Sequence, residues 1–194
     1  MRKILDRFSL YELVLLTVMA ALGIAIKPVV TTLAHIVCGP LMIPGGSVAG
    51  GLYMMWLIIG YGLVKKPGSA FIIGVIQALL VMFTGIIGSH GIMSLVTYTA
   101  PGLAVELVML IMRHRCCCVG CCAIGGIAAN VTGTACVNAV FFKVPGVYLI
   151  LVLAIAALSG MIGGIIGWQL IKLFDGFNDR MKGRKRGKDS WKEE

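Results

Sequence analysis

The sequence predicts an all-α integral membrane protein, a bundle of six transmembrane helices whose N and C termini are both cytoplasmic. Of its 194 residues, 59% are hydrophobic and only 13% are charged, and the mean hydropathy is +0.97. A water-soluble domain needs a polar outer shell, and this composition does not supply one. The apolar residues form unbroken runs near the roughly 20 residues of a membrane-spanning helix, instead of the short alternating segments of a β-barrel.

Six apolar segments follow one another along the chain. The first comes after a short basic stretch, but it is too long for a signal peptide, and Lys27-Pro28 stands where a cleavage site would be expected. The connections are short and rich in Gly and Pro, without room for a hydrophilic domain. We therefore predict one transmembrane domain at residues 1–175 and a charged cytoplasmic tail at 176–194. The predicted helices are Tyr11–Leu33, Ser47–Val64, Ser69–Gly88, Ile92–Met112, Val119–Phe142 and Val147–Leu173.

Basic residues predict how the bundle is oriented. All of the 17 lysines and arginines except Lys27 and Lys143 fall on the side of the two termini. Because cytoplasmic loops are enriched in Lys and Arg, this side is expected to be the cytoplasmic one, in a multi-pass protein of the cell membrane, most simply a bacterial cytoplasmic membrane. The net charge of +9 is concentrated in a tail of mixed charge without a basic-aromatic motif, which disfavours nucleic-acid binding.

Polar residues inside the apolar segments mark a candidate binding site. They recur at helical spacing and should turn away from lipid, where polar groups are costly. At about 1.5 Å per residue, most lie in the outer half of the membrane, and Glu106 lies roughly 10 Å above the inner surface. We predict a site open to the outside, with Glu106 as its floor. Its lining residues are Gln77, Tyr98, Asn130, Thr134 and Asn138.

Alternative roles exist for these polar groups. The asparagines and Thr134 suit interhelical hydrogen bonds equally well. Lys27 can extend to the outer headgroups. His35 and His90 fall in predicted outer loops and are read as ordinary loop residues.

Small residues indicate close helix packing in two segments. Ala21 and Ala25 are four residues apart, as are two glycine pairs in the last segment, Gly160 with Gly164 and Gly163 with Gly167. This spacing lets helix backbones approach each other in a membrane. It fits either packing within the bundle or a docking face for another membrane subunit.

The sequence contains no recognisable catalytic or cofactor motif. It lacks a nucleotide-binding P-loop, HExxH, GxSxG and paired intramembrane carboxylates, so we predict neither an enzyme nor a bound cofactor. Five cysteines cluster on the predicted cytoplasmic side, where thiols stay reduced. Adjacent cysteines do not fit one tetrahedral metal, so apolar filling or acylation is the better explanation. They are Cys116, Cys117, Cys118, Cys121 and Cys122.

The chain resembles the substrate-binding S components of energy-coupling factor (ECF) transporters. Its first segment, LTVMAALGIAIKP, is similar to the small-residue helix with which S components contact their coupling subunit. KKPGSAFIIGVIQALLVMFTG and PGLAVELVMLIMRHR look like the branch associated with thiamine or hydroxymethylpyrimidine. The chain departs from that branch in having no carboxylate from Ser69 to Gly88 and no Trp in the following turn. The matching residues are Lys66, Pro67, Gly68, Glu106, Leu107, Val108 and Arg113.

This resemblance implies a substrate-capture subunit for a vitamin or vitamin precursor. A transmembrane coupling subunit would dock on Ala21, Gly23 and Ala25, and two ATPase subunits would supply the energy. The first alternative is a stand-alone channel or ion-coupled transporter that uses Glu106 as its protonatable group. The second is a membrane enzyme that acts on lipid, with His35 or His90 as its catalytic base. The outer side of the sequence has no carboxylate to orient such a histidine.

Overall fold

The computed structural model describes residues 8–39, 44–85, 91–112, 118–143 and 145–190, and their side chains except at residues 142 and 179–190. Within these residues the chain forms six α-helices, a 3₁₀ turn and a short π-helix, which confirms the all-helical prediction. Five of the helices are long and apolar enough to cross a membrane, and the remaining one, α4, is apolar but shorter. The elements are α2 (Leu10–Cys38), α3 (Gly45–Val64), α4 (Ser69–Thr84), η2 (Gly91–Met93), α5 (Ser94–Ile111), α6 (Val119–Val137), η3 (Asn138–Phe142) and α7 (Gly146–Ser190).

The largest differences from the predicted boundaries are at three helix ends, those of α2, α4 and α7. The first helix contains Pro28 without a break and continues to Cys38, more than one turn beyond the predicted end at Leu33. The third ends at Thr84, because Gly85 adopts the left-handed conformation (φ 61°) and its N–H bonds to the carbonyl of Val81. Gly88, the predicted end, lies outside the described residues.

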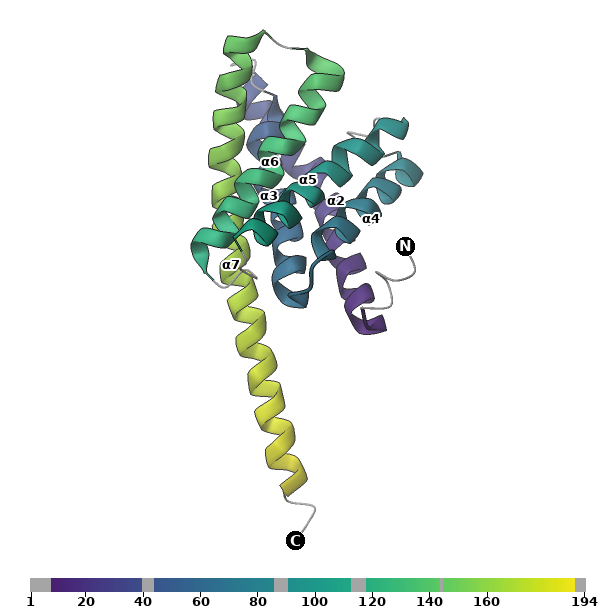
Figure 1. Ribbon diagram of the computed structural model, residues 1–194, viewed down its shortest axis with the longest axis vertical. Helices are drawn as coiled ribbons and strands as arrows, with labels where there is room; N and C mark the ends of the chain where they lie inside the picture. The colour runs from purple at the N-terminus through teal and green to yellow at the C-terminus, as the bar shows by residue number, and fades with distance from the viewer. Residues whose placement is uncertain (1–7, 40–43, 86–90, 113–117, 144, 191–194) are drawn as a thin grey trace.

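Two ion pairs gather helix ends at one end of the bundle, which we call the basal end. Lys65 and Lys66 follow the last residue of α3; Lys65 pairs with Asp175 of α7 at 3.0 Å, and Lys66 pairs with Glu12 of α2 at 2.7 Å. Both pairs are partly exposed, so each contributes at most about 1 kcal/mol to stability. The opposite, distal end holds the last turn of α2 and the first turns of α3 and α7 (Figure 1).

The three helices α3, α6 and α7 pack backbone against backbone through small residues. A side chain at Gly51 of α3 would collide with the carbonyl of Ser159 of α7, and one at Gly163 of α7 would collide with the backbone of Gly51. A side chain at Gly160 would likewise meet the backbone of Gly126 of α6. These glycines serve packing within the bundle, the first of the two roles that their spacing allows.

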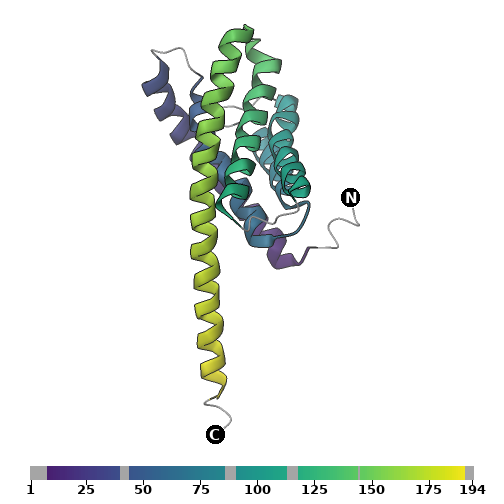
Figure 2. The same ribbon diagram turned by 60° about the vertical axis from the view of Figure 1, so that its left-hand side comes forward.

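Helix α7 is 45 residues long and extends well beyond the other helices at the basal end (Figures 1 and 2). It runs without a break through residue 175, where the predicted transmembrane domain ends, and continues to Ser190. Asp175, paired with Lys65, marks where the helix passes the basal end of the bundle. The segment expected as a tail is therefore helical from residue 176 to 190, and the domain boundary stays a prediction.

Candidate functional site

Lys27 of α2 is turned into the bundle. Its Nζ donates a hydrogen bond to the hydroxyl of Tyr98 on α5 and lies 4.4 Å from the centre of the Tyr98 ring and 5.4 Å from that of Tyr53 on α3. Aromatic faces attract cations electrostatically, so the two rings partly replace water around the ammonium group. The alternative in which Lys27 extends to the headgroups is not the one observed.

Neighbouring groups hold these side chains in place. Tyr98 is buried, with 5% of its surface exposed, and the Tyr53 hydroxyl donates to the carbonyl of Gly46 at 3.0 Å. Gln77 of α4 is also buried and lies against Gly23 of α2, where a Cβ would collide with Nε2 of Gln77. Since Gly23 stands one turn before Lys27, polar groups from four helices meet along one face of α2.

Two buried polar atoms beside these groups lack a hydrogen-bond partner among the described residues. They are Oγ1 of Thr31, one turn after Lys27 on α2, and Nε1 of Trp56, three residues after Tyr53 on α3. Buried donors without partners are rare in proteins, so such atoms are candidates for binding something else. We call Lys27, Thr31, Tyr53, Trp56, Gln77 and Tyr98 the Lys27 cluster.

Glu106 lies at the basal end and caps a helix. Its Oε1 accepts a hydrogen bond from the backbone N–H of Ala70 at 2.8 Å, in the first turn of α4. The first N–H groups of a helix have no partner within it, and a carboxylate there is further stabilised by the helix dipole. Glu106 therefore has a structural partner, and its predicted place at the floor of the site stays without structural support.

Asn130 links three helices through its side-chain amide. Its Nδ2 donates to the carbonyls of Ser47 on α3 at 3.0 Å and Ala156 on α7 at 2.7 Å, and only 1% of the residue is exposed. This is the interhelical role that the sequence left open. Thr134 and Asn138 lie further along the same chain segment toward the distal end and are half-buried.

The predicted docking residues divide between two faces of α2. Ala21 and Ala25 are exposed, in line with large exposed side chains such as Val18 and Val29. Gly23 is buried between α2, α3 and α4 and is not part of that face. Its small size serves the approach of Gln77 instead.

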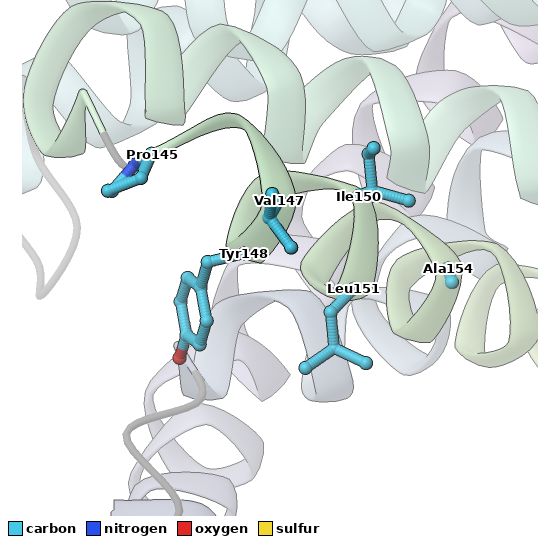
Figure 3. A pocket seen from close by; sticks show the side chains of 6 residues that line it. All are labelled: Pro145, Val147, Tyr148, Ile150, Leu151 and Ala154. Carbon is cyan, nitrogen blue, oxygen red and sulfur yellow. The ribbon is translucent and has the colours of Figure 1, made fainter.

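A shallow hollow at the start of α7 has a different character. Its lining comes from Pro145 and the first turns of α7, and the Tyr148 hydroxyl is its one polar side-chain group (Figure 3). Most of these residues are exposed, as expected for a surface that faces lipid. The hollow is therefore a poor candidate for a polar solute. It is lined by Pro145, Val147, Tyr148, Ile150, Leu151 and Ala154.

The remaining sequence candidates add no site among the described residues. No group of three or more His, Cys, Asp or Glu side chains there could hold a metal ion. Cys118 and Cys121 lie with their sulfurs 3.1 Å apart at the start of α6. His90, Arg113, Cys116 and Cys117 lie outside the described residues.

Of the predicted lining residues, Gln77 and Tyr98 lie in the Lys27 cluster, and their binding of a solute stays a prediction. The other members of the cluster were not among the predicted lining residues. The sequence places Lys27 in the outer half of the membrane. Its position on the same helix face as Gly23 and Thr31 was the signal that could have assigned it to the cluster. No pattern in α3 indicated that Tyr53 would lie near Lys27 or that Trp56 would lie against Gly23.

Comparisons with known proteins agree with this architecture. A family model described as "ABC-type cobalt transport system, permease component" matches residues 11–132. A solved structure described as the crystal structure of an S-component of an ECF transporter has the same fold, with a TM-score of 0.69 and 20% sequence identity over 94% of this chain and 98% of that one. No curated protein matches the chain by sequence. The chain thus belongs to the family of permease components of ABC-type cobalt transport systems, a family of multi-pass transport subunits, and it has the fold of an ECF S component.

Proposed function

We propose that this chain is the substrate-capture subunit of an ECF-type importer for a vitamin or vitamin precursor. The observation that carries the proposal is the Lys27 cluster, in which buried polar groups from four helices converge within an apolar bundle. Polar groups in transmembrane segments are costly and usually serve substrate binding or transport. The shared fold with an S component supports the same role.

The charge distribution supports a site on the outer side. Lys65, Lys66 and Lys172 belong to the basal end, which the positive-inside rule assigns to the cytoplasm together with both termini. Lys27 lies roughly 25 Å along α2 from its basal start, at 1.5 Å per residue. In this orientation the Lys27 cluster lies in the outer half of a hydrocarbon core about 30 Å thick, where an imported solute arrives.

Energy would come from other subunits. The chain carries no nucleotide-binding motif. We propose that a transmembrane coupling subunit docks on the exposed face of α2 at Ala21 and Ala25, and that two ATPase subunits drive it. Small side chains on an exposed helix face permit the close backbone approach that such docking needs.

The nature of the solute is a finer proposal. The resemblance to the thiamine and hydroxymethylpyrimidine branch includes the Lys66-Pro67-Gly68 turn and Glu106. Both lie at the start of α4, where Glu106 accepts the N–H of Ala70 just after that turn. The resemblance in these two motifs is therefore better evidence for a shared fold than for a shared substrate. Within that branch, a solute without positive charge suits the cationic Lys27 better than cationic thiamine does.

Co-purification tests this function. We expect the tagged chain, expressed in its native membrane, to bring down a transmembrane coupling protein and nucleotide-binding subunits in stoichiometric amounts. An unrelated six-helix membrane protein with the same tag is the control. A chain that purifies alone and still transports solute into liposomes would contradict the proposal and favour the stand-alone transporter.

A further inference from the structure

The charge of Lys27 is not balanced by any carboxylate among the described residues. The two ion pairs found there use Lys65 and Lys66, both at the basal end, and Glu106 is engaged at the start of α4. Tyr98 and Tyr53 offer a hydroxyl oxygen and two ring faces, which stabilise an ammonium group less than an anion does. A lysine within a membrane span usually pairs with an opposite charge.

The groups around Lys27 are well supplied with hydrogen-bond donors. The indole N–H of Trp56 has no hydrogen-bond partner among the described residues. The hydroxyl of Thr31, a residue that is only 8% exposed, has none there either. Gln77 adds an amide NH₂ against Gly23. An indole N–H can only donate, so its natural partner is an acceptor oxygen. A cluster that contains a cation and unpaired donors has the groups that bind an anionic oxygen.

We propose that the captured solute carries a carboxylate or phosphate group and that Lys27 binds this group. The inference rests on the proposed function and specifies its substrate class. In this proposal the anionic group of the solute pairs with Lys27, which has no carboxylate partner among the described residues. The same group accepts hydrogen bonds from Thr31 and Trp56. The rings of Tyr53 and Tyr98 then contact the apolar part of the solute. Selectivity then comes from charge at one end and aromatic contact at the other.

The test identifies what the full-length protein retains on purification. Four proteins are compared in the same detergent: the wild type, Lys27→Arg, Lys27→Met and the control Lys143→Met, which removes a cation from the exposed turn before α7. Small molecules released by denaturation are identified by mass spectrometry. We expect one water-soluble acid at near-stoichiometric level in the wild type and Lys143→Met, a reduced level in Lys27→Arg, and at least a tenfold loss in Lys27→Met.

A second measurement on the wild type does not depend on a variant that folds. The retained acid and its primary amide are compared in a competition assay, and the acid should bind at least tenfold more tightly. The inference is wrong if the retained molecule is neutral, cationic or only an anionic lipid, if no soluble acid is found, or if Lys27→Met retains the acid at the wild-type level. A chain that associates with a coupling module while it carries a neutral solute refutes this inference alone, whereas failure to associate refutes the proposed function.

Discussion

Glu106 on α5 accepts a hydrogen bond from the backbone N–H of Ala70 on α4 at 2.8 Å. The contact joins the basal parts of two neighbouring helices and satisfies N–H groups that a helix start leaves open. A residue that sequence alone suggests for substrate binding or proton transfer thus has a structural role at the end of the bundle away from the Lys27 cluster.

Replacing Glu106 should affect stability more than binding. Glu106→Ala removes the acceptor of the Ala70 N–H and is expected to cost about 1 kcal/mol, as the loss of a helix N-cap does, whereas Glu106→Gln keeps an acceptor oxygen and should cost less. Thermal unfolding of the purified protein measures the difference. If Glu106→Gln loses solute binding at an unchanged melting temperature, the structural role is wrong and Glu106 belongs to the binding site.

Asn130→Ala should destabilise the junction of α3, α6 and α7. It removes the two hydrogen bonds from the Asn130 amide to the carbonyls of Ser47 and Ala156, and a hydrogen bond contributes about 0.5–1.5 kcal/mol net. The matched control is Thr17→Val on the exposed face of α2, where the hydroxyl bonds only to its own helix at Leu13. Equal melting temperatures for the two variants would show that Asn130 does not hold the helices together.

Gly163→Ala should disrupt the contact between α3 and α7. The added methyl group meets the backbone of Gly51, which cannot rotate away as a side chain can, and overpacking typically costs about 1–3 kcal/mol. Gly176→Ala, on the same helix with no atom nearby, serves as the control and should be neutral or stabilising because alanine favours helices. A melting temperature of Gly163→Ala equal to that of Gly176→Ala would contradict this packing.

The double variant Ala21→Leu with Ala25→Leu should weaken association with a coupling subunit. Both residues are exposed on α2, so larger side chains leave the fold intact but keep a partner helix at a distance. We expect at least a tenfold reduction in co-purified coupling subunit with no change in retained solute. Val29→Leu, further along the exposed part of α2, is the control; if it weakens association as much, the small residues are not the contact.

The fold could be predicted because the membrane imposes simple rules on sequence. Long apolar runs gave the helices, and small residues four apart, as in Gly160 and Gly164, indicated close packing that the structure shows inside the bundle. The extension of α7 to Ser190 was missed because its charged residues do not continue the apolar run, although they still favour a helix.

The candidate site was predicted only in part because helical spacing does not identify tertiary partners. Asn130 and Tyr98 both lie on polar faces, yet one binds backbone carbonyls of two other helices and the other meets Lys27. Gly23 is one of the small residues of α2, but it faces Gln77 and not the exposed surface. Such distinctions depend on how helices are rotated against each other, which the one-dimensional pattern leaves open.

The central claim, that this chain captures a solute for a separate energy source, is tested most directly by uptake into proteoliposomes. The solute identified from the purified protein is supplied outside, and the chain is reconstituted alone or with its co-purified coupling and ATPase subunits, with ATP or a non-hydrolysable analogue enclosed. We predict accumulation only with all subunits and hydrolysable ATP. Accumulation by the chain alone, driven by an ion gradient and independent of ATP, would contradict the account.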